Sequence, residues 1–308
     1  MITNLSPASQ AFLNGLDLIQ QKITTANEQL SSGLKLNVAS DEPDQIGNVL
    51  QLRANIAQNN QTLTNLSTVQ TEANTAGQAL EDASKLMDQA VSLATQGANT
   101  TTSASEYQTL ALQVQNIMQQ MVSYSQTSVN GRFIFSGDDD QNPPYQLDLS
   151  SGNGVDQLTT ASATRQIQDP AGGTFSVDQT AQQIFDDRNP DGSYAAGNVF
   201  ASLNTLLVAM QNNDTTGVAN SIASLQAANT HLNNSLSFYG DVQDRLQSAT
   251  DYANNYNVQL QTQLSQAQDA DATSAALELT QGNTQLQAAY AAQAKLPTQS
   301  LFSYLPPG

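Results

Sequence analysis

The chain has no cysteine and only one histidine among its 308 residues. The absence of cysteine excludes disulfide bonds, thiolate metal sites and a thiol nucleophile. Basic residues are also scarce: nine Lys and Arg stand against 27 Asp and Glu, which gives a formal net charge of −18. Such a charge repels the phosphate backbone of nucleic acids and anionic membrane surfaces. We therefore expect neither a nucleic-acid-binding nor a membrane-binding protein.

Long apolar runs are missing as well. No window approaches the roughly 18 uninterrupted apolar residues that a membrane-spanning helix needs. The N-terminus MITNLSPASQ lacks the basic start and apolar block of a cleavable signal peptide. Hydrophobic residues still make up 39% of the chain, which is enough to bury a core. We expect a folded protein that, if exported, leaves the cell by a route that cleaves no signal.

Apolar residues recur at alternating steps of three and four, the spacing of a coiled-coil seam. The N-terminal segment carries this seam at Phe12, Leu16, Ile19, Ile23, Ala26 and Leu30. The pattern predicts an amphipathic helix that begins near Pro7 and ends at Gly33 as its C-cap. The same spacing predicts further helices over about 46–95, 107–124, 200–210, 214–267 and 271–295.

The segment from 131 to 195 interrupts this helical pattern. Candidate short strands lie between turn-forming sequences rich in glycine and proline, in FIF (133–135), YQLDLS (145–150), ATRQIQ (163–168) and TFSV (174–177). We expect Gly131 to break the preceding helix and Phe133-Ile134-Phe135 to begin the first strand. The predicted fold class is mainly α with a small β-rich insert.

A helix of about 50 residues cannot bury its apolar stripe alone, so the N- and C-terminal halves are expected to pack into one long antiparallel helical rod. The β-rich insert would then lie at the far tip of the rod and the chain ends at the opposite tip. This organisation predicts a terminal coiled-coil domain (1–45 and 265–308), a helical rod domain (46–130 and 196–264) and an outer β-rich domain (131–195).

Several motifs resemble the flagellin family. EQLSSGLKLNVASDEPDQIG at 28–47 is similar to its N-terminal signature, in which a leucine-serine-glycine step, here ending at Gly33, closes the first helix. GRFIFSG at 131–137 is similar to the segment that marks the family member at the junction of hook and filament. That motif comprises Gly131, Arg132, Phe133, Ile134, Phe135 and Gly137. QQIFDD at 182–187 and SLFSYL at 300–305 fit the same member.

The resemblance implies a structural, non-enzymatic subunit of the bacterial flagellum that polymerises through its terminal helices and connects hook to filament. It also implies an extracellular location, export by the flagellar type III apparatus without a cleaved signal peptide, and no cofactor. The implied partners are further copies of the chain, hook-associated protein type 1, flagellin and a cytoplasmic flagellar export chaperone. Two alternatives stay open: a flagellin that forms the filament itself, and a calcium-dependent adhesin carried by residues 131–195.

The two ends of the chain carry few charges, which suits burial among neighbouring subunits. The charged residues of 1–40 and 271–308 are Asp17, Lys22, Glu28, Lys35, Asp271, Glu278 and Lys295. We expect the assembly interface to consist of apolar residues from both ends, namely Phe12, Leu16, Ile19, Ile23, Leu30, Leu279, Leu286, Tyr290, Leu296 and Leu301.

Other motifs are only weak indications of a metal-binding or catalytic site. Residues 187–192, DRNPDG, match the first half of a calcium loop, but Asn198 occupies the position of its bidentate glutamate. We therefore interpret them as an Asx-type turn, and the acidic run 138–140 as a solvated loop. His231 has no paired base or nucleophile in the pattern and is expected to be structural. The sequence predicts no catalytic, cofactor-binding or metal-binding residues.

Overall fold

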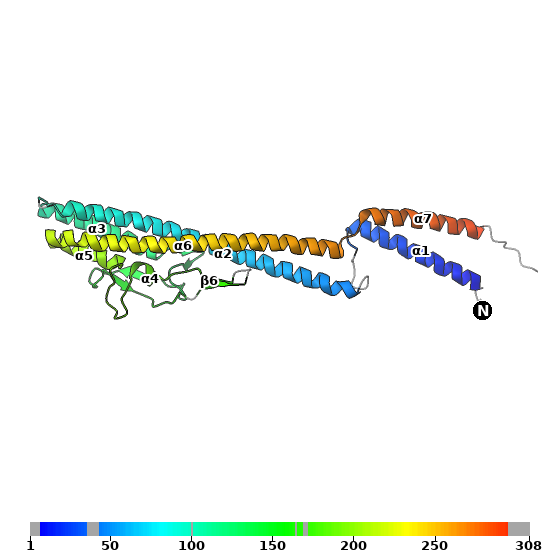
Figure 1. The fold of residues 1–308 in the computed structure, drawn as a ribbon, viewed down its shortest axis with the longest axis horizontal. Helices are drawn as coiled ribbons and strands as arrows, with labels where there is room; N and C mark the ends of the chain where they lie inside the picture. The colour runs from blue at the N-terminus through cyan, green and yellow to red at the C-terminus, as the bar shows by residue number, and fades with distance from the viewer. Residues whose placement is uncertain (1–6, 36–42, 100, 164, 169–171, 295–308) are drawn as a thin grey trace, which may run out of the picture. The chain divides into compact units, whose positions relative to one another are not determined.

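The computed structural model describes residues 7–35, 43–99, 101–163, 165–168 and 172–294. Helices dominate these residues (Figure 1), and the predicted mainly α fold class with a small β-rich insert is confirmed. The helices are α1 (Pro7–Ser32), α2 (Pro43–Gly97), α3 (Ala104–Ser125), α4 (Ala181–Phe185), α5 (Val199–Gln211), α6 (Thr215–Gln268) and α7 (Ala272–Ala294).

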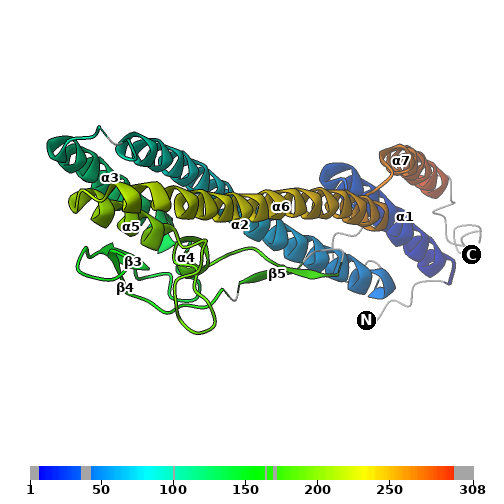
Figure 2. The same ribbon diagram turned by 60° about the vertical axis from the view of Figure 1, so that its left-hand side comes forward.

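The strands form three antiparallel two-stranded hairpins rather than one sheet. They pair β1 (Ser128–Val129) with β2 (Arg132–Phe133), β3 (Tyr145–Leu147) with β4 (Val155–Gln157), and β5 (Gln166–Gln168) with β6 (Thr174–Ser176). Figure 2 shows the β3–β4 pair below α5, and the segment of β5 running along α2. β1, β4 and α4 lie outside the strands and helices that the sequence predicted.

The chain divides into two compact units. Unit 1 comprises residues 1–60 and 256–308, and unit 2 comprises residues 61–255. The long helices α2 and α6 contribute residues to both units. Unit 1 therefore combines a segment from each end of the chain, and unit 2 is the continuous stretch between them.

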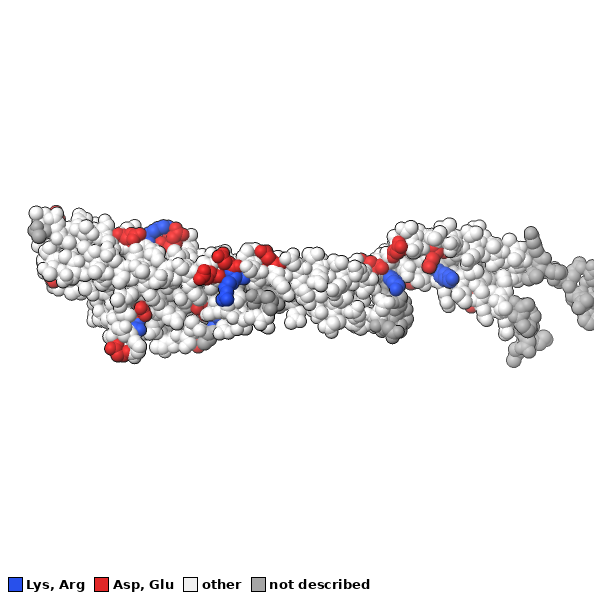
Figure 3. Space-filling view, viewed as in Figure 1, with Lys and Arg blue, Asp and Glu red and all other residues white. Residues whose placement is uncertain are grey.

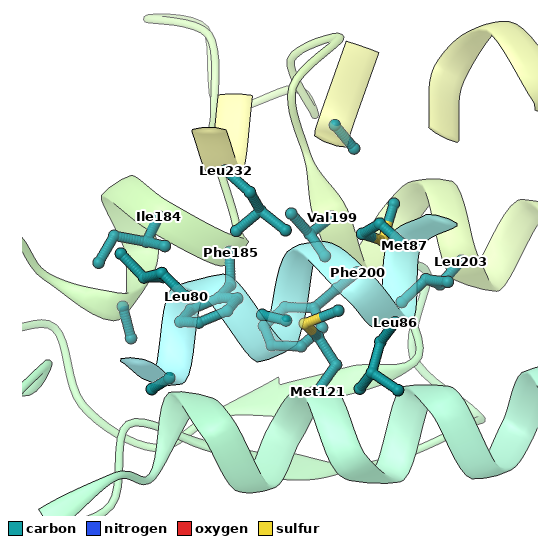
Figure 4. Packing of buried hydrophobic residues seen from close by; sticks show 14 of the residues in the cluster. Leu80, Leu86, Met87, Met121, Ile184, Phe185, Val199, Phe200, Leu203 and Leu232 are labelled. Carbon is teal, nitrogen blue, oxygen red and sulfur yellow. The ribbon is translucent and has the colours of Figure 1, made fainter. Parts of the chain in front are cut away.

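The core of unit 2 lies between α2, α6 and the shorter elements packed on them. Figure 4 shows buried side chains meeting there, among them Leu80 of α2, Met121 of α3, Phe185 of α4, Phe200 of α5 and Leu232 of α6. These side chains are almost fully buried. Full burial of a Leu or Phe side chain stabilises a fold by about 1.5–3 kcal/mol. The short elements that the sequence marked weakly are therefore held by this core rather than by their own propensity.

Hydrogen bonds join α2 and α6 along their outer edges. In unit 2, Ser84 Oγ donates to Asn229 Oδ1 (2.7 Å), and Asn229 Nδ2 donates to Asp88 Oδ1 (2.7 Å). In unit 1, Asn257 Nδ2 donates to Asn60 Oδ1 (2.6 Å). Residue numbers rise along one helix as they fall along the other, so the two helices are antiparallel. The pairing of the two halves of the chain predicted from helix length is present in both units.

The turn between α2 and α3 is fixed by one buried tyrosine. Tyr107 is 2% exposed, and its hydroxyl donates to the carbonyl of Gly97 at the end of α2 (2.6 Å). It also lies 2.8 Å from Thr215 Oγ1 at the start of α6. Ser103 and Glu106 form a reciprocal capping box that begins α3. The ends of three helices are thereby joined at one point.

The prediction for Gly131 was wrong. α3 ends at Ser125, and Asn130 and Gly131 form the two-residue turn of the β1–β2 hairpin with φ angles of 53° and 77°. Both residues adopt the left-handed conformation that a type I′ turn requires, which Asn-Gly supplies at low cost. The first strand therefore precedes Gly131, and Phe133 ends β2 instead of starting a strand through Phe135.

The rest of the motif anchors this hairpin to the core. Phe135 is fully buried, and its ring lies edge-on to Phe185 (5.9 Å between centroids) and to Tyr239 (6.1 Å). Arg132 Nε donates to Asp140 Oδ2 (2.6 Å). Ile134 is partly buried and packs against the core. The aromatic residue that looked like a strand signal is a core anchor that joins residues 131–137 to α4 and α6.

A buried carboxylate organises the segment after α4. Asp186 is fully buried, and it accepts hydrogen bonds from Tyr145 Oη (3.1 Å), Asn153 Nδ2 (3.0 Å), Asn198 Nδ2 (2.8 Å) and Arg188 Nε (2.9 Å). Burial and the charge of Asp186 raise the pKa of Tyr145, so this hydroxyl stays a donor. Three donors from separate segments and the nearby Arg188 converge on one side chain, which fixes β3, the β3–β4 turn and the start of α5 together.

We predict that Gly137→Ala destabilises the protein far more than Gly131→Ala. Both glycines have positive φ, but only at Gly137 would a Cβ overlap backbone, lying 2.9 Å from the carbonyl carbon of Ser162. Left-handed strain costs about 1 kcal/mol at either site. The added clash brings Gly137→Ala to about 3 kcal/mol. Urea unfolding of the two variants measures the difference, and equal losses would show that Ser162 does not lie against Gly137.

Candidate assembly surface

The helices from the two ends of the chain, α1 and α7, pack along each other in unit 1. Their buried and partly buried positions follow the predicted steps of three and four. On α1 they are Ser9, Phe12, Leu16, Ile19, Ile23, Ala26 and Gln29, and on α7 they are Ala275, Leu279, Gly282, Leu286 and Ala289. This is the seam of a two-stranded antiparallel coiled coil.

Small residues let the two helices approach closely. Ala26 is fully buried and Ala275 is 2% exposed. A Cβ added at Gly282 would lie 2.7 Å from Ile23 Cγ1, which is closer than two carbon atoms can pack. Ile23 therefore fills the space above Gly282, and the seam is narrow.

Main-chain hydrogen bonds tie the two helix breaks of unit 1 to each other. α1 ends as predicted at Gly33, which has a φ of 73° and donates to the carbonyl of Gln29 (2.8 Å). The chain then makes a short bridge in which Lys35 N donates to Gln268 O (2.7 Å) and Ala270 N donates to Gly33 O (2.9 Å). The chain directly after α1 is thus held to the segment that joins α6 to α7.

Asp271 caps the start of α7. Its Oδ1 accepts the backbone N–H of Thr273 (2.8 Å), and its Oδ2 accepts the hydroxyl of Ser274 (3.0 Å). These hydrogen bonds, first from the side chain and then from the backbone of Ser274, hold the pKa of Asp271 below its usual range. A charged N-cap restarts the helix directly after the break.

The predicted interface residues occupy different positions around this seam. Six of them are partly buried in it: Phe12, Leu16, Ile19, Ile23, Leu279 and Leu286. Leu30 is 38% exposed and Tyr290 is 54% exposed. Leu296 and Leu301 lie outside the described residues. The seam thus already pairs α1 with α7 of the same chain, and contact with a neighbour would have to use residues beyond it.

Other large apolar side chains of α1 and α7 face away from the seam, and the sequence prediction missed them. Leu13 is 45% exposed, and Leu18 and Leu277 are each 57% exposed. At 3.6 residues per turn Leu13 and Leu18 fall on opposite flanks of the α1 seam, while Leu277 falls on the far side of α7. We define these three residues with Tyr290 as the outer apolar set. A heptad count selects a single stripe, so it passes over residues on the flanks.

Charge is sparse around the outer apolar set. In Figure 3 the face of α1 and α7 that is shown carries few coloured side chains. The charged residues of the two helices are Asp17, Lys22, Glu28 and Glu278. A surface with so few charges and several exposed leucines is more stable when a partner covers it than when it faces water.

The acidic segments 187–192 and 138–140 make hydrogen bonds and ion pairs within the chain. Asp191 Oδ1 accepts both the backbone N–H and the hydroxyl of Ser193 (3.0 and 2.6 Å), which is an Asx-type turn. In the acidic run, Asp140 pairs with Arg132, and Asp138 Oδ1 accepts the N–H of Ser162 (2.9 Å). Among the described residues, no group of three or more His, Asp or Glu side chains is placed to hold a metal ion.

His231 has a structural role. Its Nε2 lies 2.7 Å from the carbonyl of Gln183 and therefore donates to it, which joins α6 to α4. Its Nδ1 lies 3.9 Å from Asp187 Oδ2. No nucleophile is among these contacts of the ring. In the described part of the chain, no helix is both long enough and apolar enough to cross a membrane.

We predict that Gly282→Leu loosens the α1–α7 pair, because a side chain there must displace Ile23. Overpacking of this kind costs about 1–3 kcal/mol, so amide exchange over residues 12–26 of α1 should accelerate about tenfold or more. Gly15→Leu is the matched control, since nothing lies within 4 Å of a Cβ at Gly15. Hydrogen exchange with mass spectrometry measures both variants, and unchanged exchange in Gly282→Leu would contradict the packing.

Comparison of the sequence with protein-family models gives two matches. Residues 3–140 match the bacterial flagellin N-terminal helical region, and residues 222–305 match the bacterial flagellin C-terminal helical region. Between them the two matches cover α1, α2 and α3 at one end, and α7 with most of α6 at the other. No curated protein sequence matches the chain at a significant level.

Solved structures share the fold at low sequence identity. A flagellar hook-associated protein from Vibrio parahaemolyticus aligns with a TM-score of 0.64 and 16% identity, over 74% of this chain and 100% of the other. Bacillus cereus FlgL gives 0.55 and 18%, over 71% and 100%. The flagellar junction protein FlgL from Legionella pneumophila gives 0.56 and 12%, over 72% and 99%.

The two family matches span both ends of the chain, and they contain the α1–α7 pair on which the candidate surface is built. The solved structures add that the architecture is one found in flagellar proteins. The chain therefore belongs to the flagellin family, and it is a structural, non-enzymatic component of the bacterial flagellum.

Proposed function

We propose that this chain is the hook–filament junction protein FlgL, also called hook-associated protein type 3, and that it polymerises through α1 and α7. The observation that carries the proposal is the outer apolar set, which the pairing of α1 with α7 leaves uncovered. The fold supports the junction assignment, because two of the similar structures are those of proteins named FlgL. The GRFIFSG motif at 131–137 supports the same member of the family.

Assembly follows from the width of the apolar surface on α1. One partner helix covers one stripe of a two-stranded seam, and α7 already occupies it. Leu13 and Leu18 lie on either side of that stripe, so neighbours on two sides are needed to remove both from water. Burial of one leucine is worth about 1.5–3 kcal/mol. The inner seam then holds the subunit's own helices together, and the outer apolar set holds subunits together.

The remaining assignments follow from the junction role. Residues 1–45 and 265–308 form the assembly domain, 46–130 and 196–264 the helical domain, and 131–195 the outer domain. The partners are further copies of the chain, hook-associated protein type 1 on the hook side and flagellin on the filament side. An export chaperone holds the chain in the cytoplasm before the type III apparatus carries it, without a cleaved signal peptide, to its extracellular position.

We predict that Ile19→Asp abolishes assembly while unit 2 stays folded. An aspartate in the seam places a charge between α1 and α7, and without the pair the outer apolar set is no longer presented. The matched control is Gln20→Asp, which adds the same charge one residue away at an exposed position. Sedimentation of the purified protein with hook-associated protein type 1 and flagellin measures assembly, and circular dichroism checks that the fold is kept.

Two outcomes would change the account. Assembly by Ile19→Asp equal to that of Gln20→Asp would refute the role of α1. Long filaments formed by the purified wild-type chain alone would instead identify a filament flagellin, because a junction protein is expected to form at most short assemblies without its neighbours. The second outcome would keep the proposed assembly surface and change only the proposed position of the chain in the flagellum, from the junction to the filament.

A further inference from the structure

The β5–β6 hairpin is attached to the helices of unit 2 at its base. Arg165 precedes β5 and Val177 follows β6, and Val177 N donates to Arg165 O across the base (3.3 Å). The guanidinium of Arg165 pairs with Glu72 of α2 at 2.5 Å. Nearer the tip, the guanidinium of Arg245 on α6 lies 5.1 Å from the centre of the Phe175 ring. One ion pair and one cation–π contact therefore seat the hairpin on α2 and α6.

Asp178 lies directly after this base and is 8% exposed. Its Oδ1 is buried without a hydrogen-bond partner among the described residues, and the same holds for Oε1 of the neighbouring Gln179. Asp178 borders a cavity of about 10 Å³ that Val177, Arg165, Glu72 and Tyr239 also line. A buried carboxylate oxygen with no donor is costly when the group is ionised and far less so when it is neutral.

The charged and titratable groups around Asp178 come from every element packed against it. Glu72 faces it from α2, Arg165 from the hairpin base and Tyr239 from α6. Arg165 is already paired with Glu72. The Tyr239 hydroxyl accepts the N–H of Gln179 (3.2 Å). An ionised Asp178 therefore adds a second carboxylate to a site that holds one guanidinium.

We propose that the base of the β5–β6 hairpin is a proton-operated latch: neutral Asp178 keeps the hairpin seated on α2 and α6, and ionised Asp178 loosens it. The hairpin, rather than the whole unit, responds, because Asp178 and Arg165 belong to the hairpin base while Glu72 and Tyr239 belong to helices held by the main core. This conformational device is independent of the assembly surface of α1 and α7.

The direction of the response follows from the charge balance. Burial raises the pKa of Asp178 to about 6 from 3.8, with Arg165 opposing the rise and Glu72 adding to it. Because this pKa is above its ordinary value, the seated state has its full stability at low pH and loses stability as the pH rises through about 6. Between pH 5 and pH 7.5 this linkage amounts to about a tenfold change in the equilibrium between seated and open hairpin.

We test the latch by amide hydrogen exchange of β5 and β6 at pH 5 and pH 7.5, with rates corrected for the intrinsic effect of pH. The wild-type chain should show about tenfold less protection at pH 7.5. Asp178→Asn, which is neutral at both values, should show equal and high protection at both. Wild-type protection that does not change with pH, or a pH response that persists in Asp178→Asn, would overturn the proposal.

His231→Gln is the control for another side chain of α6 that bonds to this part of the chain. Glutamine can still donate to the carbonyl of Gln183, so the variant replaces the imidazole ring and keeps this contact. The wild-type pH response should persist in His231→Gln, and its loss would assign the effect to His231 and overturn the role of Asp178. Should Asp178→Asn fail to give a native circular dichroism spectrum, Asp178→Ser supplies a smaller neutral side chain for the same measurement.

Discussion

Antiparallel pairing between helices from the two halves of the chain is the interaction on which the rest of this structure depends. α2 has 55 residues and α6 has 54, and neither could hold an apolar stripe of that length in water without a partner. In unit 2, α3, α5 and the β hairpins pack against the α2–α6 pair. In unit 1 the same principle continues in α1 and α7, and the main-chain hydrogen bonds beside Gly33 hold the end of α1 to the segment between α6 and α7.

The two pairs differ in what covers them. The α2–α6 pair of unit 2 is enclosed by further elements, so side chains such as Leu80 and Leu232 reach full burial. The α1–α7 pair has its seam and little else, with Ala26 and Gly282 bringing the helices close and the outer apolar set left exposed. A pair of this kind has surplus apolar surface and few charges, and both properties favour contact with other subunits. Under the proposed function, folding of unit 1 and assembly depend on the same two helices.

The long helices could be predicted to within a few residues because their apolar spacing continues over many turns. α1 and α7 were expected to end at Gly33 and near residue 295, and the structure places their ends at Ser32 and Ala294. The cap signal helped as well, because Gly33 closes α1 as expected. A signal repeated many times in the sequence outweighs any single misleading residue.

Short elements were predicted poorly because the sequence marks each of them with only one or two residues. Whether such a residue forms a turn, a strand or a helix end depends on how it packs against the core. Gly131 was expected to break a helix, yet Asn130-Gly131 is a common hairpin turn and was the signal that could have identified β1 and β2. α4 has five residues, and its only local sign is the Thr180–Gln183 capping box.

Two features that matter for the candidate site and the outer domain left no mark in the sequence pattern. The role of Asp186 depends largely on Tyr145, Asn153 and Asn198, which lie 12 to 41 residues away and which no local pattern reveals. Leu13, Leu18 and Leu277 of the outer apolar set were missed because heptad spacing identifies the stripe facing one partner and carries no information about a second. Exposure of Leu13 and Leu18 could be seen only once α7 was in place beside α1.

The central claim is that the inner seam of α1 and α7 lies within one chain and leaves the outer apolar set for neighbours. The most direct test is the double variant Ile23→Cys/Gly282→Cys, which is clean because the chain has no cysteine of its own. A Cβ at Gly282 lies 4.0 Å from Ile23 Cβ, within the range for a disulfide. After mild oxidation of assembled protein, the account predicts a disulfide within each chain and a monomer on a non-reducing gel. Covalent dimers, or no disulfide at all, would contradict it.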